Sequence, residues 1–145
     1  MNRSIVIYVL GYILKTEGVL MSLPCFISLI YREKEGWAYF IVAMISILLG
    51  QLMSMRKPKD YVIYLKEGCV ATSLSWILMG VVGAIPFMIT GEIPSFINAL
   101  FEMVSGFTTT GASILSDVEA VSRCSTTWRC FSHWIGGMGV LVFIL

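Results

Sequence analysis

The sequence predicts an all-α membrane protein, in which two N-terminal transmembrane helices precede a repeat of helix, short helix, loop and helix. The composition is the first observation: 57% of the residues are hydrophobic and 13% are charged, whereas about a quarter are charged in soluble domains. The second is a series of apolar runs long enough to cross a bilayer. The third is a shorter apolar run that leads directly into Thr108, Thr109, Thr110 and Gly111.

The first two apolar runs form a predicted N-terminal helix pair, residues 1–56. The first span covers residues 5–31, and Pro24 predicts a kink because proline lacks the N–H that a helix uses. The second span covers residues 37–55, and its roughly 19 residues are enough to cross the hydrocarbon core. A cytoplasmic linker, residues 57–67, follows this pair.

Residues 68–145 make up the predicted repeat. Its first span, residues 69–90, contains small residues that let helices approach closely, namely Gly80, Gly83 and Ala84. The next run, residues 94–107, would be only about 20 Å long as a helix, too short to cross. The last span begins near residue 128 and is still apolar at the end of the chain, where it reads VLVFIL. We therefore expect the front part of a longer protein, with the last helix truncated.

The basic residues orient the predicted helices. Five lie before the first span or between the second and third, and four lie in the opposite loops; the first set is Arg3, Arg56, Lys57, Lys59 and Lys66, and the second is Arg32, Lys34, Arg123 and Arg129. By the positive-inside rule the N-terminus is cytoplasmic, in a multi-pass protein of the cell membrane. The threonine loop then lies toward the extracellular side.

The short run at 94–107 is predicted to be a re-entrant helix. Its polar residues recur every three or four positions and share one helical face: Ser95, Asn98, Glu102 and Ser105. An amphipathic helix lying in the membrane interface is the alternative, but such helices usually carry Lys or Arg on the polar face, and this one does not. The loop and the spanning segment that follow directly favour the re-entrant interpretation.

The chemistry of this loop suits a dehydrated cation. Irregular backbone at membrane depth survives only where protein or a water-filled cavity surrounds it. A re-entrant helix directs its C-terminal carbonyl groups toward the cation, and Gly111 permits unusual backbone angles in the following loop. Carbonyl and threonine oxygens can replace the hydration shell of the ion. The repeat is therefore predicted to be helix, pore helix, filter loop and helix, and its ligand is potassium.

Two stretches carry a resemblance to a known family. FEMVSGFTTTGASIL and WRCFSHWIGGMGVLVF resemble the first membrane–pore–membrane repeat of Trk-type potassium uptake proteins, in the Trk/Ktr/HKT superfamily. KEGCVATSLSWILMGVVGAIPF is similar to the first helix of that repeat, and the two N-terminal spans resemble the extra helix pair of the Trk branch. The resemblance covers nearly the whole chain.

This resemblance implies a potassium pore of four repeats in one polypeptide, each contributing one filter strand with a single glycine. It assigns the potassium filter to Thr108, Thr109, Thr110, Gly111 and Ala112. The implied partners are the bilayer, the remaining repeats, a second copy in a homodimer, and a cytosolic nucleotide-binding regulatory subunit. Apart from potassium as the transported ion, no cofactor is implied.

Two alternative functions remain open. Four copies of this chain could supply four filter strands and form a minimal homotetrameric channel. The chain could also be a non-conducting fragment that associates with other membrane proteins. A net charge of +1 gives no indication of nucleic acid binding, and no nucleophile–base pair or phosphate-binding loop suggests an enzyme.

Other residues have predicted roles outside the filter. Lys15 and Glu17 are charges inside a span, and we interpret them mainly as helix-packing or partner contacts. We hypothesise that Glu102 and Arg129 form a buried ion pair that braces the filter. Glycines near the start of the last span are interpreted as sites of close helix packing: Gly136, Gly137 and Gly139. The spacing of Cys124 and Cys130 leaves a disulfide open, and a zinc site there would lack a fourth ligand.

Overall fold

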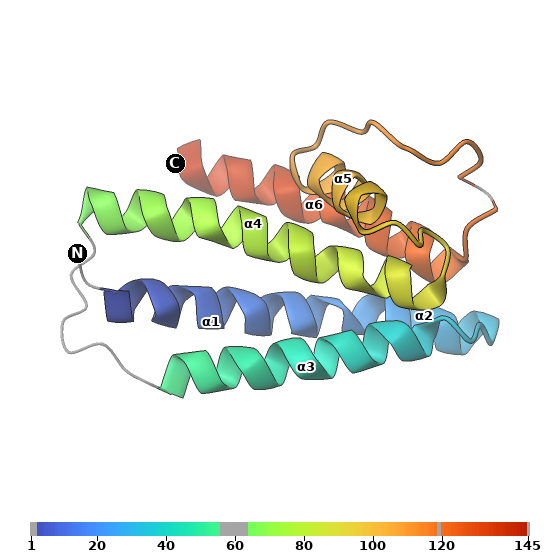
Figure 1. The fold of residues 1–145 in the computed structure, drawn as a ribbon, viewed down its shortest axis with the longest axis horizontal. Coiled ribbons are helices and arrows are strands. Elements are labelled where there is room, and N and C mark those ends of the chain that lie inside the picture. The colour runs from blue at the N-terminus through green and yellow to red at the C-terminus, as the bar shows by residue number, and fades with distance from the viewer. Residues whose placement is uncertain (1–2, 56–63, 119, 145) are drawn as a thin grey trace.

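The computed structural model describes residues 3–55, 64–118 and 120–144, and it is helical as predicted (Figure 1). Its elements are α1 (Arg3–Leu20), α2 (Ser22–Tyr31), α3 (Gly36–Met55), α4 (Leu65–Thr90), α5 (Phe96–Phe107) and α6 (Arg123–Ile144). Three stretches are long and apolar enough to span a membrane: Arg3–Tyr31, Gly36–Met55 and Leu65–Thr90. The all-α class of the prediction is confirmed for the described residues.

The first span is interrupted at Met21, three residues before the proline that predicted a kink. Pro24 has no N–H to donate to the carbonyl group of Leu20, and its ring would clash with that carbonyl in a regular helix. The helix therefore ends at Leu20 and restarts at Ser22. Pro24 itself is fully buried, so the interruption is packed into the bundle.

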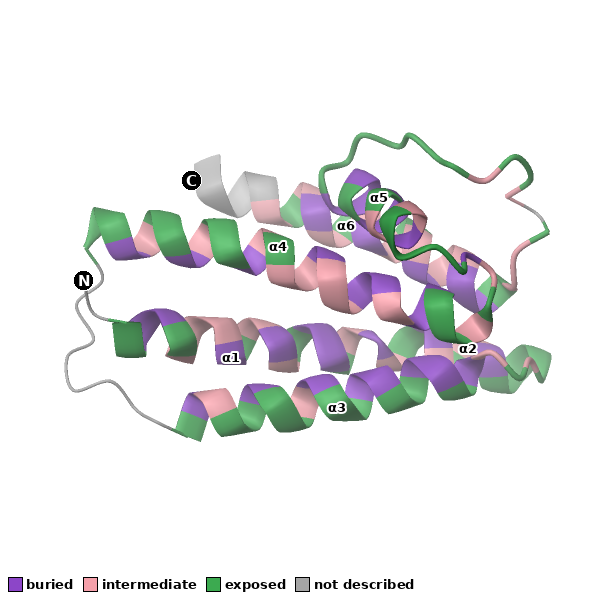
Figure 2. Ribbon diagram, viewed as in Figure 1, coloured by how far each residue is buried: buried purple, intermediate pink, exposed green. Residues whose placement is uncertain are grey.

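Glycines set the spacing between α1 and α3. A Cβ atom on Gly11 would lie 2.9 Å from the carbonyl oxygen of Gly50, and one on Gly50 would lie 2.6 Å from that of Gly11. Gly18 would meet the carbonyl oxygen of Ala43 at 2.9 Å. The two backbones therefore touch, and the exposed aliphatic face of α3 points away from the bundle (Figure 2).

The core lies between the N-terminal pair and the repeat. Its fully buried large side chains include Met21 from the N-terminal pair and five from α3, α4, α5 and α6: Tyr39, Phe87, Met103, Phe107 and Trp128. The indole N–H of Trp128 donates to the carbonyl oxygen of Gly83 at 3.2 Å, which satisfies a buried donor. This core holds α5 and α6 against the rest of the molecule.

The segment between α4 and α6 enters and leaves the bundle at the same end. α5 runs across the long helices, and the chain then returns along the surface to the start of α6 (Figure 1). The end of α5 lies against Gly136, which is about 20 Å along α6 from Arg123 at 1.5 Å per residue. The short helix therefore ends well inside the bundle, away from the end at which the segment enters, as a re-entrant helix does.

Some boundaries differ from the sequence prediction. α4 begins at Leu65 rather than near residue 69, and α6 begins at Arg123 rather than near residue 128. Carboxylates from distant loops bind the N–H groups of Ser122, just before α6, and of Arg123, its first residue, which local periodicity does not reveal. Residues 56–63, with Arg56, Lys57, Lys59 and most of the predicted linker, lie outside the described residues.

Candidate functional site

The polar face of α5 is turned toward the returning loop. Glu102 is 1% exposed and Ser105 is 7% exposed, whereas Phe101 and Val104 on the opposite side are open. An amphipathic helix in the membrane interface would show the reverse, with polar groups in water. The burial therefore contradicts the interfacial alternative and gives the polar face a structural role.

Backbone N–H groups of the loop fold back onto the last turn of α5. The N–H of Thr108 donates to Val104 at 2.9 Å and that of Thr109 donates to Gly106 at 2.9 Å. The N–H groups of Thr110 and Gly111 both reach the carbonyl oxygen of Ser105, at 3.0 and 3.4 Å. These bonds satisfy helix carbonyls that would otherwise lack a partner at the C-terminus.

This arrangement leaves the loop carbonyls for another ligand. The carbonyl oxygens of Thr109, Thr110 and Gly111 accept no hydrogen bond from the residues that the structure describes. All residues from 108 to 112 are exposed, although they lie at depth beside α6. Free carbonyl groups and threonine oxygens along an exposed strand are the groups that coordinate a monovalent cation.

Two residues of the loop have left-handed backbone angles. Gly111 has φ +76°, where glycine carries no steric penalty. Thr109 has φ +57°, which is uncommon for a residue with a side chain and costs about 1–2 kcal/mol. The need for glycine at position 111 is predictable from the sequence, but the conformation of Thr109 is not.

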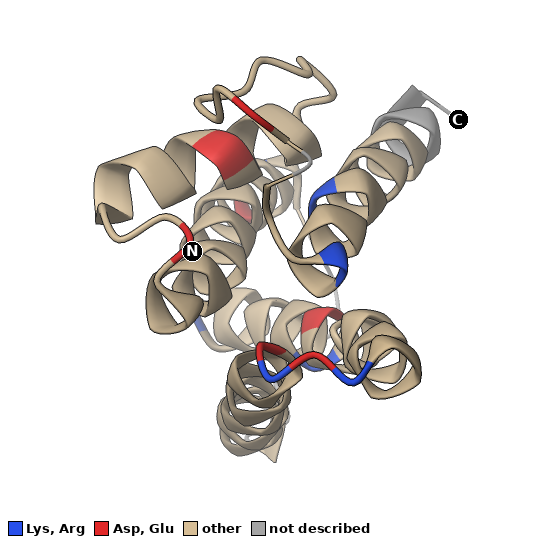
Figure 3. Ribbon diagram, turned by 90° about the vertical axis from the view of Figure 1, so that its right-hand side faces the viewer, with Lys and Arg blue, Asp and Glu red and all other residues tan. Residues whose placement is uncertain are grey.

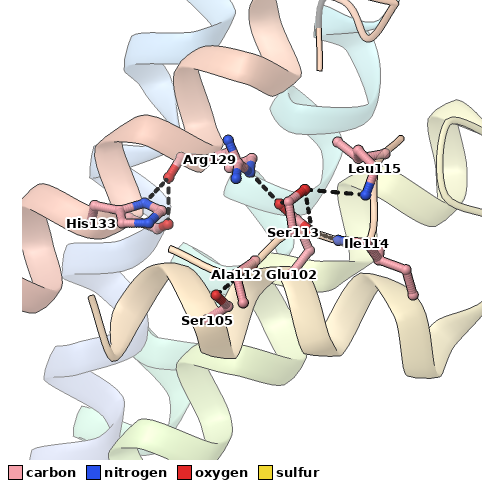
Figure 4. Close-up of polar contacts among 9 residues, drawn as sticks. Glu102, Ser105, Ala112, Ser113, Ile114, Leu115, Arg129 and His133 are labelled. Carbon is pink, nitrogen blue, oxygen red and sulfur yellow. Dashed lines mark hydrogen bonds and ion pairs between the residues drawn. The ribbon is translucent and has the colours of Figure 1, made fainter. Parts of the chain in front are cut away.

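Ser105 and Glu102 form hydrogen bonds to the extended segment, residues 112–114, that follows the threonine loop (Figure 4). The hydroxyl of Ser105 donates to the carbonyl oxygen of Ala112 at 2.6 Å. The carboxylate of Glu102 accepts from the hydroxyl of Ser113 at 3.0 Å and from the N–H of Ile114 at 3.0 Å. Helical periodicity places Ser105 and Glu102 on one face, as predicted, but it does not reveal these contacts.

The hypothesised ion pair between Glu102 and Arg129 is present. The Nε of Arg129 contacts a carboxylate oxygen of Glu102, whose side chain is fully buried, and the arginine side chain is 14% exposed. The pair joins the middle of α5 to the first turns of α6 (Figure 4). Its effect on the filter stays a prediction.

The end of α5 and the middle of α6 meet through small residues. A Cβ atom on Gly136 would lie 2.0 Å from the carbonyl oxygen of Phe107, so only glycine permits this contact. A Cβ atom on Gly106 would lie 2.0 Å from the hydroxyl oxygen of Ser132. The predicted packing role of Gly136 is confirmed, and Gly106, next to the last residue of α5, also packs against α6. Gly137 and Gly139 have only ordinary contacts, at 3.9 and 3.6 Å.

The remaining candidate residues lie away from the loop. The ammonium group of Lys15 lies over the ring of Tyr12, 4.7 Å from its centre. Glu17 is 2% exposed, and its carboxylate oxygens have no hydrogen-bond partner among the described residues. Cys124 and Cys130 are free thiols, so the disulfide that the sequence left open is not formed between them. Instead, the thiol of Cys124 donates to the carbonyl oxygen of Pro24 at 3.2 Å.

The fold defines the class first: an all-helical chain, among the described residues, with three stretches long and apolar enough to span a membrane. The sequence model of the TrkH family, described as cation transport protein, matches residues 36–144, and this chain belongs to that family. Relatives include an uncharacterized cation transporter of Methanocaldococcus jannaschii, with 31% identity, and the Trk system potassium uptake protein TrkG of Escherichia coli, with 33% identity. The two alignments cover 94% and 98% of this chain but 29% and 30% of those relatives.

A solved structure shares the arrangement of these helices. The crystal structure of the potassium transporter TrkH from Vibrio parahaemolyticus superposes with a TM-score of 0.91 at 27% sequence identity. The match covers 98% of this chain and 31% of the transporter. The chain thus spans about a third of the proteins it resembles, and the predicted resemblance to Trk proteins is confirmed.

Proposed function

We propose that this chain contributes one of four selectivity-filter strands to a potassium-conducting pore of the Trk type. The single observation that carries the proposal is the loop after α5. There the N–H groups of four consecutive residues turn back to the helix, and the carbonyl groups of Thr109, Thr110 and Gly111 have no partner among the described residues. One such strand contacts an ion from one side, so the complete pore needs further strands.

The proposal extends to the surroundings of the pore. Potassium is the transported ion, and the remaining strands come from further repeats of the complete transporter. A second copy of that transporter and a cytosolic nucleotide-binding regulatory subunit are the proposed partners. The protein lies in the cell membrane with its N-terminus in the cytoplasm, so α5 enters from the extracellular side.

Substitution of Gly111 by serine tests the filter assignment. Serine at φ +76° is strained by about 1–2 kcal/mol, so the strand would relax and move its carbonyl groups. We expect the potassium-over-sodium selectivity of the complete transporter to fall roughly tenfold, as 1.4 kcal/mol would give. Ion flux into proteoliposomes measures this ratio.

Gly91→Ser is the matched control for this experiment. Gly91 has φ +77°, close to that of Gly111, but it ends α4 and has no atom within 4 Å of an added Cβ. Serine at this position therefore introduces the same backbone strain, but away from the threonine loop. Equal selectivity in Gly111→Ser, Gly91→Ser and the unmodified transporter would refute the filter assignment.

A further inference from the structure

The first turn of α6 has its four N–H groups satisfied, two of them by the adjacent Ser122 and two by a carboxylate from elsewhere in the chain. The hydroxyl of Ser122 accepts from the N–H of Ser125 at 3.2 Å, which is an ordinary N-cap. The N–H groups of Arg123 and Cys124 donate instead to the two carboxylate oxygens of Glu33, at 3.1 and 3.0 Å. Glu33 lies in the loop between α2 and α3, outside the repeat.

This loop holds Glu33 in a defined position. Arg32 ends α2 with φ +56°, and the N–H of Glu33 then donates to the carbonyl oxygen of Ser28 at 3.0 Å. The hydroxyl of Ser28 donates to the carbonyl oxygen of Glu33 at 2.7 Å. Ser28 therefore binds both the N–H and the carbonyl group of Glu33, and these two bonds fix the backbone from which the carboxylate extends.

Three further contacts join the N-terminal pair to the same turn of α6. The buried hydroxyl of Tyr39 on α3 donates to that of Ser125 at 2.8 Å. The guanidinium of Arg123 lies 4.4 Å from the ring centre of Tyr31. The thiol of Cys124 on α6 donates to α2. Figure 3 looks onto this end of the bundle, where basic and acidic residues alternate along the α2–α3 loop.

α6 in turn determines where the filter loop lies. Arg129 contacts Glu102, Gly136 touches the backbone of Phe107, and the Nε2 of His133 would lie 3.9 Å from a Cβ on Gly111. A shift of α6 along its axis would move each of these contacts. Because protein interiors are close-packed, empty space cannot take up such a shift, and the neighbouring backbone moves with α6.

From these contacts we infer that Glu33 is a positioning residue for the selectivity filter. It anchors the N-terminus of α6 to the helix pair that precedes the repeat, and α6 transmits this position to residues 108–112. A negative charge at a helix N-terminus is also favoured by the helix dipole. The inference rests on the proposed filter function of the loop.

The test measures potassium-over-sodium selectivity of the complete transporter in proteoliposomes. Glu33→Ala removes both acceptors, and we expect a loss of selectivity of roughly fivefold, which corresponds to about 1 kcal/mol. Glu33→Gln keeps one acceptor oxygen, so we expect a smaller loss. If Glu33→Ala does not fold, Glu33→Gln and Tyr39→Phe carry the test, since each removes one contact with α6. The selectivity ratio does not depend on how many transporters insert, so a role in folding alone would leave it unchanged.

Glu35→Gln is the matched control, because it removes the same charge from the same loop, and among the described residues no hydrogen bond or ion pair joins the Glu35 side chain to α6. Selectivity that is lower in the Glu33 variants than in Glu35→Gln supports the inference. Unchanged selectivity in the Glu33 variants, together with a loss in Gly111→Ser, would overturn it and leave the filter assignment intact. Unchanged selectivity in Gly111→Ser as well would refute the proposed function itself.

Discussion

A single methyl group at Gly136 would force α6 away from the end of the pore helix. In Gly136→Ala the new Cβ would lie 2.0 Å from the carbonyl oxygen of Phe107, 2.7 Å from its carbonyl carbon and 3.0 Å from its Cα. Favourable contacts between such atoms begin near 3.5 Å. All three atoms belong to the backbone, so no side-chain rotation can relieve the overlap.

The size of the effect follows from two opposing terms. The helices must separate by roughly 1.5 Å to restore ordinary contact, and overpacking of this kind costs about 1–3 kcal/mol. We expect the upper end, because only backbone atoms are involved. Alanine is a better helix former than glycine by about 1 kcal/mol, which offsets part of the cost. The net expected loss of unfolding free energy is about 2 kcal/mol.

Reversible unfolding of the purified chain in mixed detergent micelles, followed by circular dichroism, measures this loss. Gly139→Ala is the control on the same helix, because its Cβ would lie at an ordinary 3.6 Å from the ring of Trp76. The control should be as stable as the unmodified chain, or more stable by up to about 1 kcal/mol. Equal stability of the two variants would refute the close approach of α6 to Phe107.

Two further predictions concern the clamp around the filter strand. Glu102→Gln leaves the Arg129 guanidinium partly buried without its counter-charge. We therefore expect the unfolding free energy to fall by about 3 kcal/mol in the same micelle assay. A loss no larger than that of the control variant Glu35→Gln would contradict the ion pair. Ser105→Ala removes the 2.6 Å bond to the carbonyl oxygen of Ala112, at a cost of about 1 kcal/mol, and it should also lower potassium-over-sodium selectivity in proteoliposomes. Selectivity equal to that of the unmodified transporter would show that this bond does not hold the filter.

Much of the helical architecture could be predicted because its signals are local. Apolar length identified the spans, and the 12 residues of α5 were too few to cross a bilayer. The turn chemistry of the threonine loop placed the candidate filter directly after that helix. The resemblance to Trk proteins, which the comparisons confirm, rested on the same stretches.

Other features could not be predicted, because a side chain does not reveal its distant partner. Ser105 is one of several polar residues on α5, and only the returning loop makes it a donor to Ala112. Gly106 resembles a helix-ending residue, but its role depends on Ser132 approaching from α6. The left-handed angle of Thr109 follows from loop N–H groups that turn back to α5.

The sequence alone determined that this protein is a helical membrane protein with a re-entrant segment and a threonine–glycine loop. It could do so because hydrophobic length, helical periodicity and turn residues act between near neighbours. Only the tertiary structure decided that Glu33 caps a helix 90 residues further along the chain. A carboxylate in a short charged loop is usually solvated, and its pairing with α6 depends on how independently formed helices pack together.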